Sequence, residues 1–409
     1  MSTPRPLPDR NNGRAGFGLT VLIATLSMFG PFTIDTVFPA FEQMGRQFGV
    51  SPVAMQQVTS VYLLSFAVMS LLHGPISDAV GRKPVIIVGT LAYAAASVGC
   101  ALSMNLPMLL VFRVLQGMSA GSGQIISRAV IRDMFDGPAA QRLMAQVMMI
   151  FSVAPALAPI IGGWMLGFGS WPIIFWFLAA YGVIMCVVTV VALPETHPVE
   201  ARTSLRLRPL VGGLVEVARH GAFVRLALAS SLGFAGQFLY IVAAPIFVVH
   251  LLGKGEQDFW IFFVPMIGGM LIGSFTNSRM AGRVDGRTMA TVGFTLAVAA
   301  GGLNVVVSAL PGAPHLPFAV LAPALVALGI ALAFPTLQIS MLDLFPARRG
   351  SAASMQSFTQ LVLNAVLAGL VVPLVSDSVL HLAVTGLSFS ILGWLLWTWH
   401  RRSLLRHAG

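Results

Sequence analysis

The sequence predicts an all-α transmembrane protein with twelve helices in two six-helix bundles. Three observations support this prediction. Of the 409 residues, 56% are hydrophobic and only 9% are charged, whereas a soluble surface needs roughly 25–35% charged residues. Apolar runs long enough to cross a hydrocarbon core of about 30 Å recur twelve times. The longest polar interval, 194–221, separates these runs into two sets of six.

The predicted helices are bounded by charged residues and by proline and glycine. Residues 1–16 form a polar tail, and the next run has no small-residue cleavage site, so we expect it to be retained as a helix. We expect bundles at 17–193 and 222–399, a cytoplasmic linker at 194–221 and a second tail at 400–409. The predicted spans are 17–40, 51–73, 84–104, 107–131, 142–166, 171–193, 222–249, 258–278, 288–309, 317–341, 351–376 and 379–399.

The basic residues predict the orientation of the chain. If the N-terminus is cytoplasmic, all but three of the 24 lysines and arginines fall in inward-facing segments. Arg46 and Lys254 would lie outside, and Arg113 would lie within the membrane. This bias predicts an even number of spans, with both termini in the cytoplasm. We also expect the membrane to be a bacterial inner membrane. The net charge of +10 is therefore explained by topology, and we expect no nucleic-acid partner.

The two predicted bundles share a short pattern. The segment 74–78 closes the second run and 273–277 closes the eighth, both with the spacing G-x-x-x-[D/N]. Because the two segments fall at equivalent places, they favour a parallel repeat of one six-helix unit.

The loop 74-GPISDAVGRKP-84 carries the most specific local pattern. Its glycines allow a tight turn, its acid can face a helix N-terminus or a basic group, and its basic pair favours the cytoplasmic face. It resembles the G-x-x-x-D-x-x-G-R-K signature of the major facilitator superfamily, in which this loop latches the cytoplasmic gate. The alternative is an ordinary positive-inside turn. The matched residues are Gly74, Asp78, Gly81, Arg82 and Lys83.

The run 113-RVLQGMSAGSGQIISRAVIRDMFDG-137 places polar and small residues on one helical face, at steps of three or four. It resembles the Bcr/CflA branch of the twelve-span drug:proton antiporters, through an R-x-x-Q core and the run ISRAVIRDMF. Cavity lining and helix-to-helix hydrogen bonding remain open for the last two members of this face. The face comprises Arg113, Gln116, Gly117, Ala120, Gln124 and Ser127.

Asp35 and Arg113 are the candidate proton-coupling residues. The segment 31-PFTIDTVFPA-40 is similar to the ID-x-x-x-PA ending of helix 1 in the same branch. Both charges should lie roughly 8–9 Å below the outer boundary, at about 1.5 Å of rise per residue, so a pair is geometrically possible. The alternatives are a static ion pair that braces two helices, and an Arg113 side chain that extends to the outer interface.

The segment 153-VAPALAPIIGGWM-165 resembles the proline- and glycine-rich antiporter motif of the superfamily. It departs from that motif at Ala158, where the wider pattern has glycine, which weakens the inference about transport direction. Prolines and glycines here also allow bending and close packing in a plain kinked helix. The residues with a candidate gating role are Pro155, Pro159, Gly162 and Gly163.

Further polar or amphipathic residues within the spans are individually weaker candidates for a substrate cavity. Each could instead belong to an interfacial belt or an interhelical hydrogen bond. They are Tyr62, Gln237, Tyr240, Trp260, Gln338, Gln360 and Asn364.

These patterns together predict a transporter rather than an enzyme. The sequence contains no G-x-x-x-x-G-K-[ST] loop for ATP and no metalloprotease or hydrolase motif, so we expect an ion gradient as the energy source and no cofactor or metal. The family resemblance implies a monomeric, proton-coupled exporter of small amphipathic drugs of the bicyclomycin or chloramphenicol kind, working by alternating access in the lipid bilayer. A proton-coupled metabolite importer and a non-transporting receptor or scaffold remain as alternatives.

Overall fold

The computed structural model describes residues 17–135, 143, 147, 154–155, 157–202, 207–280, 283–312 and 316–408. Throughout these ranges the regular secondary structure is helical, and no β-strand occurs. The predicted tail at 1–16 and much of the predicted span 142–166 lie outside the described residues. The prediction of an all-α protein is confirmed.

The helices of the N-terminal half follow the predicted runs. The fifth run is described as a helix over Leu157–Leu166. The other elements are α1 (Phe17–Ser27), α2 (Phe29–Asp35), η2 (Phe38–Ala40), α3 (Phe41–Phe48), α4 (Pro52–Met55), α5 (Gln57–Ser70), α6 (His73–Val80), α7 (Arg82–Ala101), α8 (Leu106–Met134) and α10 (Pro172–Ala192).

The polar interval 194–221 contains two helical elements, η3 (Val199–Ala201) and α11 (Leu207–Arg219). The C-terminal half follows directly. Its elements are α12 (Gly221–Ala244), η4 (Pro245–Leu251), α13 (Trp260–Met280), α14 (Gly286–Ala309), α15 (Phe318–Asp343), η5 (Pro346–Arg348), α16 (Arg349–Val366), η6 (Leu367–Val371), α17 (Val372–Val375) and α18 (Val379–Ala408).

Among the described residues, nine helices are long and apolar enough to cross a membrane, and a tenth span results if the bent pair at the start of the chain counts as one. The parts of this bent pair, Gly18–Ser27 and Phe32–Phe48, differ in direction by 56°. Pro31 explains a break here, because it has no N–H to donate to the carbonyl one helical turn earlier. The expected continuous helix over 17–40 is therefore wrong in detail.

The remaining two predicted runs are α8 and the helix Leu157–Leu166. α8 has 29 residues, which is ample length for a span. Arg113, Gln116 and several glycines and serines make it less apolar than the others. Each of the twelve predicted runs therefore contains helix in the described part of the chain, the run 142–166 over Leu157–Leu166.

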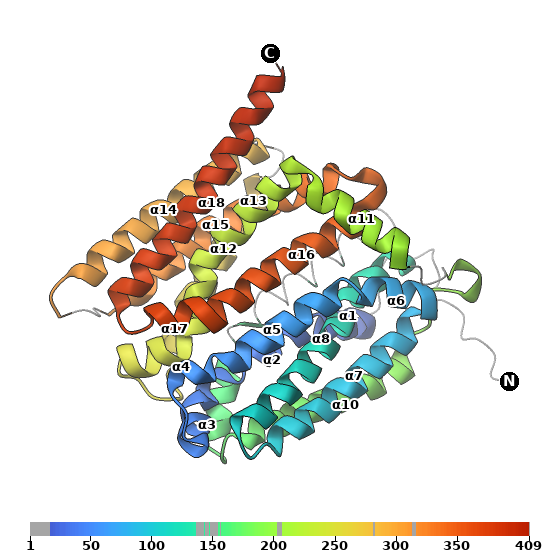
Figure 1. The fold of residues 1–409 in the computed structure, drawn as a ribbon, viewed down its shortest axis with the longest axis horizontal. Helices are drawn as coiled ribbons and strands as arrows, with labels where there is room; N and C mark the ends of the chain where they lie inside the picture. The colour runs from blue at the N-terminus through green and yellow to red at the C-terminus, as the bar shows by residue number, and fades with distance from the viewer. Residues whose placement is uncertain are drawn as a thin grey trace.

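The helices pack as two bundles (Figure 1). In the N-terminal half α7 packs on α8 and α10, and α5 packs on α8. In the C-terminal half α15 packs on α13 and α14, and α18 packs on α12 and α14. At the boundary α5 lies beside α16 (Figure 1). This contact is one of the places where the two halves meet.

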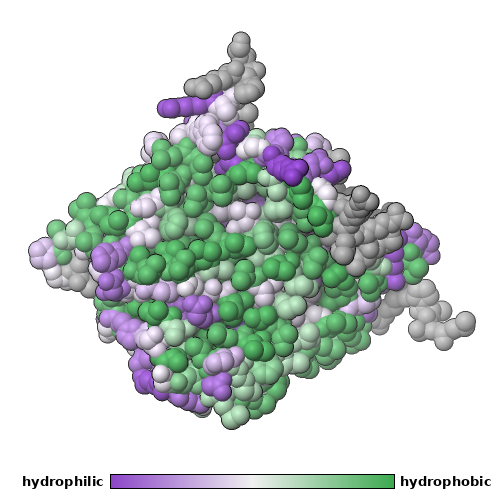
Figure 2. Space-filling view, viewed as in Figure 1, coloured by the Kyte–Doolittle hydropathy of each residue, from purple (hydrophilic) through white to green (hydrophobic). Residues whose placement is uncertain are grey.

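The surface is apolar along the spans. Hydrophobic residues cover most of the face seen in Figure 2, and hydrophilic residues gather mainly toward its margins. Large apolar side chains such as Val88, Val191 and Leu374 are exposed. Patches of this extent are unfavourable in water and are covered by lipid in a bilayer. The chain is a multi-pass membrane protein.

Candidate functional site

Asp35 is the last residue of α2, and only 3% of its surface is exposed. Among the described residues, no group donates a hydrogen bond to its carboxylate and no ion pair includes it. The neighbouring Thr36 hydroxyl donates to the Phe32 carbonyl instead. Because a buried charge without a partner is unfavourable, this position discriminates strongly between the protonated and ionised forms of a carboxyl group.

Arg113 lies on α8 and is completely buried. Its Nε donates to the Val58 carbonyl at 3.1 Å, and its Nη1 donates to Gln116 Oε1 at 2.7 Å. The guanidinium carbon lies 4.4 Å from the centre of the Tyr62 ring, a cation–π contact. Nη2 is buried without a partner. Arg113 is thus held inside the bundle, and snorkelling to the outer interface does not occur in this structure.

The expected ion pair between Asp35 and Arg113 is not observed. Arg113 contacts the Tyr62 ring instead. The donors of Arg113 are directed to Val58 and to Gln116 on its own helix instead. The spacing along the two runs predicts the charges at one level, but the rotation of each helix decides whether they touch.

A hydrogen-bond network that the sequence analysis missed surrounds these residues. The hydroxyls of Thr33 and Tyr93 lie 2.5 Å apart, which joins α2 to α7. Gln116 Nε2 donates to Ser97 Oγ at 2.7 Å, which joins α8 to α7. Tyr93 and Ser97 lie four residues apart and share one face of α7, a signal that could have identified them.

The polar face of α8 serves mainly for packing. Gly117 approaches α5 so closely that a Cβ there would lie 2.3 Å from the Tyr62 carbonyl oxygen, and Ala120 is buried. Ser127 and Ser27 share a hydrogen bond of 2.8 Å, as the helix-to-helix alternative expected. Gln124 is partly exposed and is the member of this face that remains accessible.

The C-terminal candidates divide into two groups. Gln237 and Tyr240 are buried, and they pair with Met270 Sδ at 3.1 Å and with Asn304 Nδ2 at 2.6 Å. These are contacts between helices. The more accessible group is Gln338 and Gln360, which are partly exposed, together with the buried Asn364, whose Oδ1 has no hydrogen-bond partner, and the exposed Trp260.

The loop 74–84 is held by acids that lie far away in the sequence. Arg82 forms ion pairs with Asp78 and with Asp133, the latter at 2.9 Å from Nε. Glu195 accepts from the backbone N–H groups of Arg82 and Lys83 at 3.0 and 3.3 Å, and so stabilises the N-terminus of α7. The sequence analysis assigned no role to Asp133 or Glu195.

Gly81 makes the Glu195 contact possible. Its φ is +113°, and a Cβ there would lie 2.5 Å from Glu195 Oε2. Gly74 has open space around its Cα, so the structure gives no steric reason for glycine at that position.

The two glycines that follow Pro155 and Pro159 bring the helix Leu157–Leu166 into contact with the N-terminal half and with the C-terminal half. A Cβ on Gly162 would lie 2.1 Å from the Thr36 carbonyl oxygen, and one on Gly163 would lie 2.6 Å from that of Glu256. The helix Leu157–Leu166 therefore touches the residue after Asp35 and also the loop that precedes α13.

Hydrogen bonds between the halves occur at one end of the molecule. Gln43 Nε2 and Arg46 Nη2 donate to the Glu256 carboxylate at 2.8 and 3.4 Å. Gln57 and Ser60 on α5 donate to carbonyls of η6 and α16, both at 2.9 Å. Among the described residues, no hydrogen bond from the loop 74–84 reaches the C-terminal half. The halves are closed at the Glu256 end.

Comparison with known proteins places this arrangement in a family. The sequence profile of the Major Facilitator Superfamily matches residues 20–369. The bicyclomycin resistance protein homolog of Haemophilus influenzae is 28% identical over 70% of this chain and 72% of that protein. The multidrug resistance protein MdtL of Shewanella oneidensis is 26% identical over 83% and 85% of the two chains.

Solved structures show the same fold. A bacterial homolog of the human lysosomal transporter Spinster, in an inward-facing and unoccupied conformation, has a TM-score of 0.73 and covers 98% of this chain and 99% of its own, at 15% identity. That likeness concerns the fold alone. Together with the profile match over most of the sequence and the drug-resistance relatives, it shows that the chain belongs to the major facilitator superfamily, in its Bcr/CflA branch.

Proposed function

We propose that the chain exports small amphipathic drugs, of the bicyclomycin or chloramphenicol type, in exchange for protons. The observation that carries this proposal is Asp35, a buried acid without a partner among the described residues, in a bundle that also buries the cation Arg113. Charged residues within a membrane mark ion or substrate pathways by default. The relatives named for bicyclomycin and multidrug resistance supply the class of substrate.

We also propose that the termini face the cytoplasm of a bacterial cell, with the Arg82 end inside and the Glu256 end outside. The distribution of lysine and arginine supports this orientation. The hydrogen bonds from Gln43 and Arg46 to Glu256 then close the outer end, which makes this an inward-facing conformation. Residues 17–193 and 222–399 are the two moving bodies, joined by the linker 194–221.

Protons couple to this motion through a short chain of contacts. Asp35 precedes Thr36, whose carbonyl touches Gly162, and the next residue, Gly163, touches the backbone of Glu256 in the other half. A change of charge at Asp35 therefore acts one residue away from the helix that closes the outer end. The separated Asp35 and Arg113 correspond to the protonated, inward-facing carrier, and they pair when the proton leaves and the outer end opens.

The remaining expectations belong to the same proposal. The chain works as a monomer in the bilayer, carries drug and protons, and needs neither a cofactor nor a catalytic site. Rocking of the two halves gives alternating access.

The test is drug uptake into inverted membrane vesicles whose lumen has been acidified. An exporter accumulates chloramphenicol or bicyclomycin in these vesicles, and a protonophore abolishes the uptake. Vesicles without the protein are the control. Accumulation only in right-side-out vesicles would indicate an importer. The absence of proton-driven uptake in both vesicle orientations would indicate a receptor or scaffold.

A further inference from the structure

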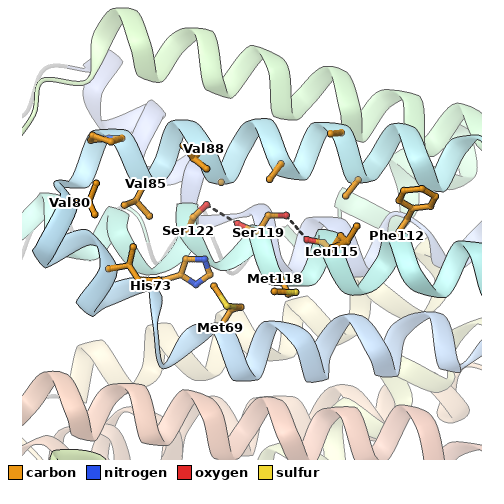
Figure 3. A pocket seen from close by; sticks show the side chains of 16 residues that line it. Met69, His73, Val80, Val85, Val88, Phe112, Leu115, Met118, Ser119 and Ser122 are labelled. Carbon is orange, nitrogen blue, oxygen red and sulfur yellow. Dashed lines mark hydrogen bonds between the residues drawn. The ribbon is translucent and has the colours of Figure 1, made fainter. Parts of the chain in front are cut away.

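A long groove lies on the lipid-facing surface of the N-terminal bundle, and neither Asp35 nor Arg113 lines it. It is lined by α5, α6, α7 and α8 and has a volume of about 600 Å³, within the roughly 300–1,000 Å³ of small-molecule pockets. Its lining on α7 runs from Pro84 to Ala96, a distance of about 18 Å at 1.5 Å per residue. The groove thus runs parallel to the spans (Figure 3).

The rim of the groove faces lipid. Val88, 66% exposed, and the exposed Leu115 and Met118 line it, and they belong to the apolar surface that the bilayer covers. Molecules that dissolve in the membrane therefore reach the groove directly. In the orientation proposed above, it begins at the Arg82 end, so it opens to the inner leaflet.

The floor of the groove is polar, although the rim is not. His73 is 4% exposed, and its ring extends from α6 toward α8 (Figure 3). The backbone carbonyl of Met69, four residues earlier, lies near this ring. The Nδ1 atom of His73 nevertheless has no hydrogen-bond partner. An unpaired polar atom in an otherwise apolar pocket points to a ligand with a complementary group.

Two serines add acceptors to this floor. The Ser122 hydroxyl donates to the Ser119 carbonyl at 2.7 Å, and the Ser119 hydroxyl donates to the Leu115 carbonyl at 2.8 Å (Figure 3). Their protons are therefore used, and their oxygens keep lone pairs that can accept. The groove suits an elongated apolar body that also carries hydroxyl or amide donors.

We propose that this groove is the site where the transporter captures its amphipathic substrate from the inner leaflet, with His73, Ser119 and Ser122 binding the polar group. This inference rests on the proposed export function. The contacts of α5 with α8 behind His73 involve glycines: a Cβ on Gly121 would lie 2.7 Å from the Phe66 ring, and one on Gly117 would lie 2.3 Å from the Tyr62 carbonyl oxygen. These close contacts leave no gap between α5 and α8 at this level, so a captured molecule passes inward only when the two helices move apart.

The first test fills the groove. Val88→Trp places a large side chain in it, and Val183→Trp, on the exposed face of α10, is the matched control outside it. For chloramphenicol uptake into inverted vesicles, we expect Val88→Trp to raise KM about tenfold, which corresponds to about 1.4 kcal/mol, with little change in the maximal rate. His73→Phe should also raise KM, and His73→Asn, which can still hydrogen bond, should restore part of the affinity. Equal KM values for the two tryptophan variants would overturn the proposal.

A second test does not depend on transport. Cys100 and Cys186 are buried, so a single Val88→Cys substitution gives a selective target for a membrane-permeant maleimide in the purified full-length protein. We expect chloramphenicol to protect Val88→Cys but not Val183→Cys. Selective protection without any proton-driven uptake would refute the proposed function and keep the groove as a binding site. Active uptake with no selective protection would refute the groove and keep the function.

Discussion

The two ends of the molecule both carry polar networks, but among the described residues only the network at the Glu256 end joins the halves. At the Glu256 end, Gln43 and Arg46 of the N-terminal half bind an acid of the C-terminal half. At the Arg82 end, the ionic contacts of Arg82 stay within the N-terminal half, and the linker residue Glu195 caps α7. Ionic groups at a gate therefore do not by themselves show which end is closed.

This difference separates two roles for charged residues. The Arg82 network stabilises one bundle in itself, because Gly81 allows Glu195 to reach the backbone at the start of α7. The Glu256 contacts depend on how the two bundles lie relative to each other, so they form and break with the conformational change. Substitutions at the two ends should affect different equilibria.

The largest effect is expected at Asp35, next to the closed end. Asp35→Asn keeps the size of the side chain and removes the exchangeable proton, so proton-driven drug uptake should be abolished while the protein remains folded. The measurement is uptake into proteoliposomes under a pH gradient, with thermal unfolding as the control for folding. Uphill transport at a normal rate would show that another group carries the proton.

Arg113→Ala should be the next most severe change. It removes the donor to Gln116 Oε1, and a buried group left without a partner costs about 1–3 kcal/mol. We expect lower thermal stability and loss of transport. Arg113→Lys should retain part of the thermal stability and part of the transport, since lysine keeps the charge without the planar geometry. Unchanged transport in Arg113→Ala would leave this cation with no part in coupling.

Glu256→Ala should selectively weaken the closed end. It removes the bond from Gln43, worth about 1 kcal/mol, and the exposed pair with Arg46, which adds little, so the outer end should open about five times more often. Maleimide reactivity of a single Ala365→Cys, placed where α16 meets α5, measures this opening. Glu42→Ala is the matched control, because Glu42 pairs with Arg46 inside α3. The same reactivity in both variants would argue against Glu256 as part of the gate.

The smallest effect is expected from Asp78→Asn at the other end. The Asp78 side chain is half-exposed, and Arg82 keeps its bonds to Asp133 and Ser77, so the loss should be no more than about 1 kcal/mol. We expect a modest shift in the reactivity of Ala365→Cys and unchanged drug affinity. A large loss of drug binding with constant reactivity would instead place this loop at the substrate site.

Much of the fold was predictable because a bilayer imposes length and composition on each span separately. The loop 74–84 and the polar face of α8 were predictable because their spacing is local. Pro31 carried a signal for the break in the first span that the sequence analysis did not use. The partners of Arg82 were not predictable, because Asp133 and Glu195 reach it only after α8 and the segment following α10 have packed beside α7.

The sequence by itself determined the number of apolar runs and the class of protein, because each depends on residue type and on spacing along the chain. The tertiary structure alone decided which groups touch. It directs Arg113 to Val58 and Gln116 rather than to Asp35, and it brings Gln43 to Glu256 across 213 residues. Helix rotation and the relative position of the bundles set these contacts, and both arise from packing over the whole chain.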